Sequence, residues 1–409
     1  MISKKLANGA QIIAISKPNT SLAVLNILVA AGSINETIET AGAAHFLEHM
    51  MFEGSKHFKD YDKTLQDLYG ENNAFTCQDY TNYYQILPYE NIEKSLELEI
   101  DRFQNLTLSE AKFQTQRNVI IEEYKETSLQ PPLSDFWHKL LLKAFPNSSY
   151  KWPVIGYSLE RFKNIKRKDL ISFYKSNYTP ENLIFTLVSG QDSSEMIQIL
   201  ESYVSKLTPK NNNINHEVII NRSKKHVKSV YKRKNIQNIS FFTAFHIADF
   251  GKEGYFEADA ISDLLTNGES SILYQEFVKN NPICLEISSF ITDNKHMNLL
   301  VFEGKLHQGV SYDRFKNQFD DLLNTFKKDL PNLQKMEMLK NKAETYFLFN
   351  NYSILNIAQN FSFWNYCDVR KEDILDRLQN LDAEKIKNIS QSIFQKHNEI
   401  EIVYIPEIV

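Results

Sequence analysis

Short apolar runs alternate with longer amphipathic stretches in the first half of the chain. Residues 22–31 are nearly all apolar and mostly branched, which is typical of a strand covered on both faces. Residues 11–15 predict the preceding strand, and Lys17-Pro18-Asn19 predicts the turn between the two. Further strands are expected at 73–76, 82–87 and 182–190, and helices around 44–50, 61–69, 92–103, 107–127 and 168–175. We expect the helix at 107–127 to start at a capping box between Thr107 and Glu110.

The second half repeats this order of elements. Residues 239–246 echo the apolar run at 22–31, and residues 256–265 echo the helix that follows it. Amphipathic helices are expected at 312–328 and 333–349, and a last strand at 399–405. Because residues 208–225 are polar and aperiodic, we predict an N-terminal domain of residues 1–207, a linker of residues 208–225, and a C-terminal domain of residues 226–409.

Composition excludes several classes of protein. A chain of 409 residues with 42% hydrophobic content can bury large cores, and its net charge of −5 leaves no basic field for nucleic acid. The sequence contains no apolar run of about 18 residues, the length that a membrane-spanning helix needs. Cys77, Cys284 and Cys367 lack the spacing of a disulfide framework or a zinc knuckle, which favours a reducing compartment. We therefore predict the cytoplasm, with the periplasm as the alternative if a signal peptide was removed.

The pentad His45-Phe46-Leu47-Glu48-His49 is the candidate chemical site. Side chains three and four positions apart share one face of a helix, so His45, Glu48 and His49 are expected to point the same way. Two imidazoles one turn apart can bind one Zn²⁺, and a glutamate between them is placed to accept a proton from water. The alternative is an ordinary amphipathic helix that happens to carry two histidines.

A catalytic zinc site needs a third ligand from another element. The helix predicted at 107–127 offers Glu122, Glu123 and Glu126, and all three have the right chemistry. Periodicity alone does not choose among them. At least two of the three are expected to face solvent, as most glutamates do.

Four motifs together resemble one known family. They are residues 42–54 around the pentad, Asn73-Ala74-Phe75-Thr76, residues 117–123, and Trp152-Pro153-Val154-Ile155-Gly156. Over nearly its whole length the chain resembles the inverted-zincin metallopeptidases of the pitrilysin type, whose single-length members include the mitochondrial processing peptidases and bacterial relatives. The resemblance implies an α+β fold with two homologous α/β sandwich domains. Each would be a mostly antiparallel sheet covered by helices, and together they would form half of a clam-shell.

The resemblance also implies roles for individual residues. His45 and His49 would bind one Zn²⁺ per chain, with Glu123 as the third ligand and Glu48 as the general base. The family often has a further glutamate where this chain has Gln116. Seven residues before Glu123, that side chain lies on nearly the same helical face and is expected to hydrogen-bond behind the ligands.

The resemblance assigns the substrate to the motif at residues 73–76. Asn73, Ala74, Phe75 and Thr76 would form an exposed edge strand on which a peptide is added as a further strand, with Phe75 as a pocket wall. The alternative for this segment is an ordinary core strand. Trp137, Tyr150 and Trp152 are expected to be core residues.

The second half departs from the family at two positions. Ile272 and Leu285 stand where an Arg and a Tyr usually contact substrate, and neither side chain can donate a hydrogen bond. Residues 258–262, equivalent to the pentad, contain no histidine, and His246 is expected to be structural. We therefore predict the zinc-bearing subunit of a bacterial heterodimer whose partner supplies the Arg and Tyr, a homodimer being the less favoured arrangement.

Two functions follow from this reasoning. The first is a zinc endopeptidase that hydrolyses short or unfolded peptides in a closed chamber. The second is a non-catalytic assembly subunit of the same fold. The complete set of His45, Glu48, His49 and Glu123 favours the enzyme, because a scaffold has little reason to retain it.

Overall fold

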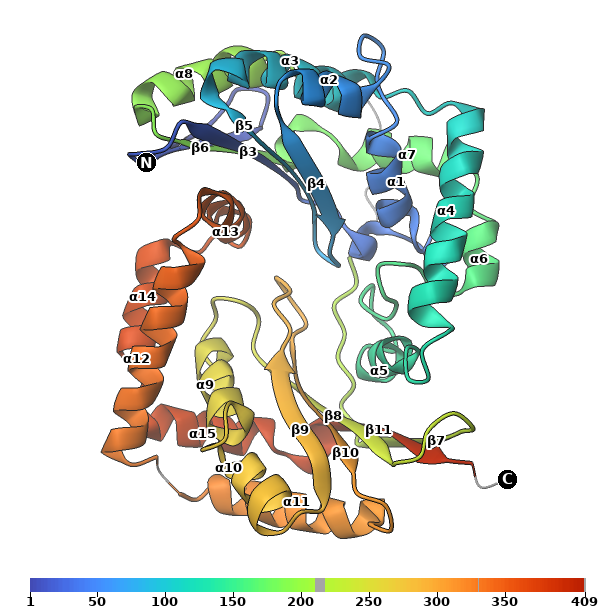
Figure 1. The fold of residues 1–409 in the computed structure, drawn as a ribbon, viewed down its shortest axis with the longest axis vertical. Coiled ribbons are helices and arrows are strands. Elements are labelled where there is room, and N and C mark those ends of the chain that lie inside the picture. Colours follow the sequence, from blue (N-terminus) through green and yellow to red (C-terminus); the bar gives the residue numbers. More distant parts are fainter. Residues whose placement is uncertain (210–217, 330, 408–409) are drawn as a thin grey trace. The chain divides into compact units, whose positions relative to one another are not determined.

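The computed structural model describes residues 1–209, 218–329 and 331–407, which form two compact units with one sheet each (Figure 1). Unit 1 comprises Met1–Lys125, Trp152–Val218 and Phe347–Lys371, and unit 2 comprises Glu126–Lys151, Ile219–Tyr346 and Glu372–Val409. Of the predicted linker 208–225, residues 210–217 lie outside the described residues. Within the described ranges, every helix is too short or too polar to cross a membrane.

The sheet of unit 1 has six strands. Their order is β1 (Ile2–Lys5), β2 (Gln11–Ser16), β6 (Leu183–Ser189), β3 (Leu22–Val29), β5 (Thr81–Pro88) and β4 (Glu71–Thr76). Neighbouring strands are antiparallel except β2 and β6, which run parallel. The strand β4 lies at one edge, so among the described strands one side of its backbone has no neighbour in the sheet.

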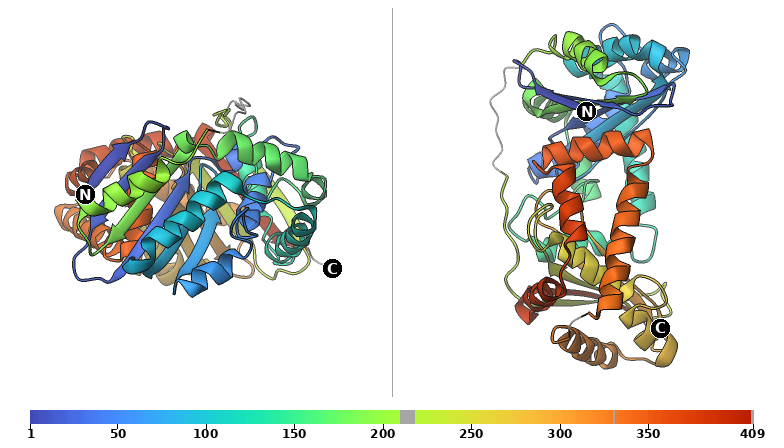
Figure 2. Two further views of the ribbon diagram at one scale, coloured as in Figure 1. Left: turned by 90° about the horizontal axis from the view of Figure 1, so that it is seen from above. Right: turned by 90° about the vertical axis from the view of Figure 1, so that its left-hand side faces the viewer.

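Both faces of this sheet are covered, as the apolar run at 22–31 predicts. Along β3, Leu25 and Ile27 pack in the main core beneath the helices, whereas Val24 and Leu28 pack on the opposite face against α13 (Ile354–Tyr366). Seen from above, α3 (Ile92–Asn105) and α8 (Ser193–Val204) lie across the strands (Figure 2). The other helices that begin in this unit are α1 (Ala43–Met51), α2 (Tyr61–Asp67), α3 (Ile92–Asn105), α4 (Glu110–Ser128), α6 (Leu159–Lys163), α7 (Arg167–Asn177) and α8 (Ser193–Val204).

The sheet of unit 2 repeats the strand order of unit 1. Its strands follow as β7 (Val227–Arg233), β11 (Glu399–Pro406), β8 (Ser240–His246), β10 (Leu299–Leu306) and β9 (Cys284–Ile291). The one parallel pair, β7 and β11, occupies the place of β2 and β6. The predicted repeat and the predicted fold class, mostly antiparallel sheets covered by helices, are therefore confirmed.

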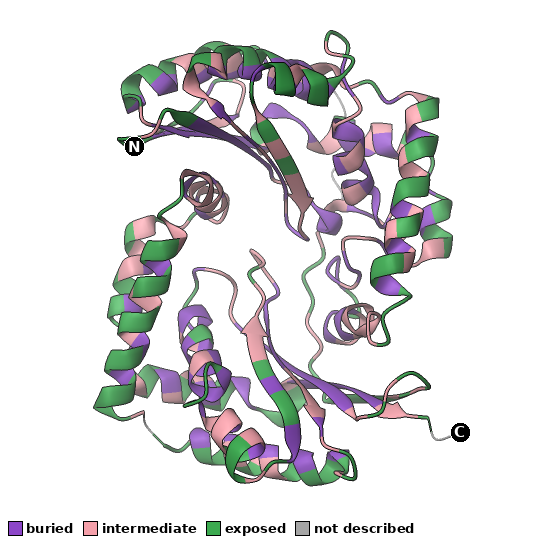
Figure 3. Ribbon diagram, in the orientation of Figure 1, coloured by how far each residue is buried: buried purple, intermediate pink, exposed green. Residues whose placement is uncertain are grey.

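Helices also cover the sheet of unit 2, and the inner strands β6 and β8 of the two sheets are buried along their whole length, whereas the edge strands β4 and β9 are partly exposed (Figure 3). The helices that lie wholly or mostly in unit 2 are α5 (Phe136–Ala144), α9 (Tyr255–Thr266), α10 (Ile272–Tyr274), α11 (Tyr312–Phe326), α12 (Leu333–Asn350), α14 (Lys371–Gln379) and α15 (Ala383–Ile393). Short 3₁₀ turns occupy 33–35, 89–91, 180–182 and 396–398, and a π turn extends α10 through 275–280.

Two helices, α5 and α13, each pack in the unit that is formed mainly by the other half of the chain. The first half contributes α5 to the sheet of unit 2, where Phe136 stacks on Phe242 with ring centroids 4.1 Å apart. The second half contributes α13 to the sheet of unit 1. The compact units thus differ from the predicted division at 208–225, because an amphipathic pattern shows which face of a helix is apolar but not which sheet it covers. The predicted domains of residues 1–207 and 226–409 remain a prediction.

A buried polar cluster fixes α13 on its sheet. Asn26 of β3 donates to Ser362 of α13 at 2.8 Å and to Asn82 of β5 at 3.0 Å, and Ser362 donates to Thr186 of β6 at 2.8 Å. All four side chains are at most 1% exposed. Buried polar groups that satisfy one another favour a single register of packing, so these contacts define where α13 docks.

The capping box predicted for the helix at 107–127 is wrong by two positions. The helix α4 begins at Glu110, and its cap is Ser109, whose hydroxyl accepts the backbone N–H of Lys112 at 3.3 Å. Serine and threonine are both good caps, so the sequence alone favours the position that also offers a glutamate three residues later.

Candidate metal centre

The helix that carries the pentad is anchored at its first turn. Gly42 precedes α1 with φ +103°, a left-handed conformation that favours glycine. The carboxylate of Glu36 accepts the backbone N–H groups of Gly42 and Ala44, both at 2.8 Å, and the indole N–H of Trp152 at 3.0 Å. Burial raises the pKa of Glu36 to about 8, although these three donors favour its charged form. Glu36 lies in a loop without a motif, so sequence reasoning missed it, and Trp152 has a contact beyond its expected core role.

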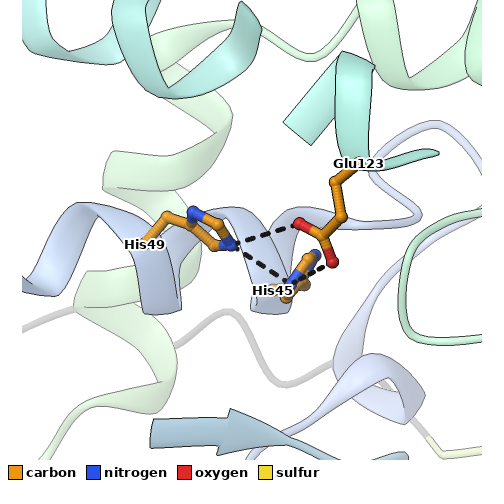
Figure 4. Close-up of side chains that lie close together, drawn as sticks. All are labelled: His45, His49 and Glu123. Carbon is orange, nitrogen blue, oxygen red and sulfur yellow. Dashed lines mark hydrogen bonds and ion pairs between the residues drawn. The ribbon is translucent and has the colours of Figure 1, made fainter. Parts of the chain in front are cut away.

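His45, His49 and Glu123 converge on one point (Figure 4). The Nε2 atoms of His45 and His49 are 3.3 Å apart, and each is 3.6 Å from a carboxylate oxygen of Glu123. A tetrahedral zinc ion with ligand distances of about 2.0–2.1 Å places its ligand atoms about 3.3–3.4 Å from one another. The donor atoms and their spacing therefore fit Zn²⁺.

The protonation of His45 suits a metal ligand. Burial, together with the neighbouring His49 ring, lowers the pKa of His45 to about 3, so its imidazole is neutral and keeps a lone pair. Among the three candidate glutamates, the structure brings Glu123 to the histidines. Glu122 pairs instead with Lys125 at 2.6 Å, and Glu126 is exposed.

Glu48 lies beside this cluster on the same helix. Its Oε2 accepts the hydroxyl of Thr76 at 2.5 Å. Burial raises the pKa of Glu48 to about 7, while the Thr76 hydroxyl lowers it and the Glu123 carboxylate raises it. A zinc ion at the site would lower this pKa, because a cation favours the carboxylate. A carboxyl group that titrates near neutral pH can both accept and return a proton.

Replacing Thr76 with Val is expected to move the acid limb of the pH profile of kcat/KM to higher pH by about one unit. The change removes a hydrogen bond to the charged form of Glu48, so the pKa of Glu48 rises and less carboxylate is present at low pH. Thr76→Ser keeps the hydroxyl and is expected to retain the original profile. A profile that Thr76→Val leaves in place would show that this contact does not tune Glu48.

One pocket of about 680 Å³ contains the cluster and part of the edge strand β4. Its lining comprises His45, Glu48, His49, Phe52, Asn73, Ala74, Phe75, Thr76, Gln116, Glu123, Val154 and Ile155. The predicted zinc ligands, base and substrate strand thus share one cavity. The rings of Phe75 and Tyr80 pack edge to face, with centroids 6.0 Å apart.

The backbone of β4 is open to a further strand. The N–H of Ala74 is bonded to the side chain of Asn73 at 2.8 Å rather than to β5. In antiparallel pairing the N–H and C=O of one residue point to the same side, so Ala74 presents both to the free edge. Lysines such as Lys4 and Lys228 protect the outer strands β1 and β7, whereas residues 73–76 carry no charge.

Gln116 lies directly behind His49. Its Oε1 is 3.2 Å from Nδ1 of His49, and its amide N–H donates to Glu53 at 2.6 Å. Sequence reasoning did not single out Glu53. The available signal is its spacing, because Glu53 follows His49 by four residues and four-residue spacing places side chains on one face.

Ile272 and Leu285, the positions at which the resemblance implies an Arg and a Tyr, lie in unit 2. Ile272 lines a separate pocket of about 280 Å³ with Leu264 and Phe326, and Leu285 is 45% exposed on β9. His246, expected to be structural, is buried with its ring 5.2 Å from that of Phe145.

A second cluster of metal-binding residue types lies in unit 2. His226, Glu399 and Glu401 have side-chain atoms close enough for one ion. However, Lys396 is 2.6 Å from one carboxylate oxygen of Glu399, and Lys316 is 2.8 Å from the other. Because two ammonium groups already neutralise the carboxylates, this cluster fits a salt-bridge network better than a metal site.

The side chains gathered in the pocket of unit 1 are those of one class of enzyme. Two imidazoles and a carboxylate with zinc spacing, beside a titratable glutamate and an open strand, are typical of metallopeptidases. Residues 11–155 match the family model described as Insulinase (Peptidase family M16), and residues 164–343 match the Peptidase M16 inactive domain. The chain belongs to peptidase family M16.

Relatives resemble the chain either over most of its length or over about half of it. It is 25% identical over 369 residues to the zinc protease PqqE of Helicobacter pylori, covering 88% of this chain and 82% of that protein. It is 30% identical over 198 residues to the mitochondrial-processing peptidase subunit beta of Rattus norvegicus, covering 47% and 40%. The crystal structure of a protease from Helicobacter pylori superposes with a TM-score of 0.92 at 22% identity and covers 99% of both chains.

Proposed function

We propose that this chain is a zinc endopeptidase that hydrolyses short or unfolded peptides. The observation that carries the proposal is the single pocket in which His45, His49 and Glu123 lie 3.3–3.6 Å apart beside Glu48 and the open edge of β4. The zinc proteases among its relatives support it. An edge strand binds peptides through their backbones, so we expect broad selectivity for sequence.

Each part of the pocket has a role in this proposal. When bound by His45, His49 and Glu123, Zn²⁺ would polarise the scissile carbonyl and make water more acidic. Glu48 accepts the proton of the attacking water and returns it to the leaving amine. The backbone of β4 holds the peptide extended, and Phe75 contributes an apolar wall beside it.

We also propose that the active form contains a second family subunit. Ile272 and Leu285 offer no donor to a substrate carbonyl, and preorganised donors contribute strongly to amide hydrolysis. A partner that carries an Arg and a Tyr would supply these donors. We propose the cytoplasm as the compartment, from the cysteine pattern of the sequence.

Peptidase activity of zinc-loaded protein on a mixture of short peptides tests the enzyme, with oligomeric state measured in the same sample. Hydrolysis by the chain alone would support the enzyme and overturn the need for a partner. Hydrolysis that appears only with a second family subunit would support both proposals. Absence of hydrolysis with stoichiometric zinc and a bound partner would favour the non-catalytic assembly subunit.

Replacing Ala74 with Pro is expected to lower kcat/KM about tenfold and to leave zinc affinity unchanged. Proline removes the N–H that faces the free edge of β4, and that N–H makes no bond to β5. The loss of one backbone hydrogen bond to substrate is expected to cost about 1.4 kcal/mol, which corresponds to a factor of ten. Ala74→Ser keeps the N–H and serves as the control. Equal kcat/KM for the two variants would contradict binding by strand addition.

A further inference from the structure

We propose that Glu53 fixes the tautomer of His49 through Gln116 and thereby aims the Nε2 lone pair of His49 at the metal. Glu53 and Gln116 are then positioning residues that act on a ligand and touch neither metal nor substrate. The inference rests on the proposed zinc site but does not require that the chain hydrolyse peptides. It assigns a role to two side chains that the proposed mechanism leaves unused.

The carboxylate of Glu53 is held in place at the end of the pentad helix. Its Oε2 is 3.1 Å from the ammonium group of Lys112, which also donates to the backbone carbonyl of Glu53. The Glu53 side chain is 20% exposed. An ionised carboxylate can only accept hydrogen bonds, so Glu53 presents a fixed acceptor to Gln116.

This acceptor determines which way the amide of Gln116 points. The amide nitrogen is 2.6 Å from Oε1 of Glu53. The reverse orientation would place the amide oxygen against the carboxylate, so that two acceptors would face each other with no proton between them. The amide oxygen of Gln116 therefore points toward His49.

The amide oxygen in turn determines the tautomer of His49. It lies 3.2 Å from Nδ1 of His49 and can only accept, so Nδ1 carries the proton. The remaining ring nitrogen, Nε2, then has a free lone pair. Nε2 is the atom that lies 3.3 Å from His45 and 3.6 Å from Glu123, so the lone pair points into the proposed metal site.

The other histidine lacks such support. Within the described residues, Nδ1 of His45 is buried and has no hydrogen-bond partner. Hydrogen bonds behind the imidazoles therefore orient only His49 of the two histidines. They run in series from Lys112 to Glu53, from Glu53 to Gln116 and from Gln116 to His49. Mutation of a residue that hydrogen-bonds to a metal ligand from behind commonly lowers metal affinity by about 10- to 100-fold.

The test is zinc affinity, measured by competition with a chromogenic chelator, in four variants of the full chain. Glu53→Gln is expected to weaken zinc binding at least about tenfold, because an amide at position 53 accepts either orientation of Gln116. Gln116→Leu is expected to weaken it by a similar factor. Adding Glu53→Gln to Gln116→Leu is expected to have no further effect, since the two residues act in series.

The exchanged pair, Glu53→Gln with Gln116→Glu, is expected to restore affinity to within about threefold. A carboxylate at 116 accepts directly from Nδ1 of His49, and an amide at 53 can donate to it. The matched control is Glu122→Gln, which removes a negative charge from an exposed position of α4 and should keep the original affinity. Melting temperatures of the metal-free variants would separate loss of zinc from loss of fold.

Two results would overturn the proposal. Unchanged affinity in Glu53→Gln would show that Glu53 does not act on the site. Equal losses from Glu53→Gln with and without Gln116 would show that it acts through its charge alone. Nitrogen NMR of histidine-labelled, zinc-loaded protein gives a further readout, in which His49 should carry its proton on Nδ1. All these measurements remain valid for a chain that binds zinc but hydrolyses nothing, so they fail independently of the proposed function.

Discussion

Replacing Glu48 with Gln is expected to lower peptide turnover about a thousandfold while zinc remains bound at its original stoichiometry. The change keeps the shape of the side chain and its ability to accept the Thr76 hydroxyl, which lies at 2.5 Å. It removes the only property that the proposed mechanism requires, the ability to take up a proton. General base catalysis typically contributes a factor of about 10²–10⁴.

The expected size of the effect follows from the surroundings of Glu48. The residue is 9% exposed and lines the same pocket as the three candidate ligands. Burial raises its pKa to about 7, and a bound zinc ion would lower that pKa, so the carboxylate that accepts the proton is present at neutral pH. The amide of a glutamine at this position cannot accept the proton. Because the residue is buried, bulk water has little access to act as the base in its place.

Metal content separates this prediction from a loss of the site. Turnover and zinc stoichiometry should be measured together, with His49→Ala expected to lose both and with Glu126→Gln, an exposed change of the same kind, expected to lose neither. Zinc-loaded Glu48→Gln that turns over peptides at the original rate would exclude Glu48 as the base.

The sequence predicts most of the candidate metal centre because its chemistry is local. His45 and His49 are one helical turn apart, and an apolar strand before them and Gly54 after them define a short helix, which the structure places at Ala43–Met51. Gln116 precedes Glu123 by two turns, so its position behind the ligands follows from the helix period. Glu123 itself needs the resemblance, because Glu122 has the same local signal.

Long-range contacts are what the sequence does not predict. The contacts of Glu36 with the first turn of α1, and of Glu53 with Gln116, join residues without a common motif. The docking of α13 on the sheet of unit 1 depends on Asn26 meeting Ser362 across the fold. A periodic pattern shows that a residue is buried, but packing decides which partner it meets.

A buried ion pair supports the end of the pentad helix, and breaking it is expected to destabilise unit 1 by about 3–5 kcal/mol. Glu99 and Arg102 of α3 are 0% and 2% exposed. Glu99 accepts from Tyr61 at 2.7 Å and from Nε of Arg102 at 2.9 Å. The guanidinium group lies 5.4 Å from the ring of Phe52, which directly follows α1.

Glu99→Leu is expected to lower the stability of unit 1 more than the removal of both charges does. The single change leaves the guanidinium of Arg102 buried without its counter-charge, whereas Glu99→Leu combined with Arg102→Met replaces the pair with apolar side chains. The double variant should therefore recover part of the stability that the single variant loses, a coupling that only residues in contact show. An exposed pair gives the contrast: Lys63 and Asp67 have side chains 69% and 65% exposed, and Asp67→Asn should change stability by less than about 1 kcal/mol.

Tryptophan fluorescence can measure this effect for unit 1 alone. The chain has three tryptophans, of which Trp152 and Trp364 belong to unit 1 and Trp137 to unit 2. In a Trp137→Phe background, urea unfolding followed by emission reports unit 1, which avoids fitting one transition to two units. If Glu99→Leu proved as stable as the double variant, the guanidinium would have another source of compensation. The end of the pentad helix would then depend on the packing of Phe52 rather than on the charge beneath it.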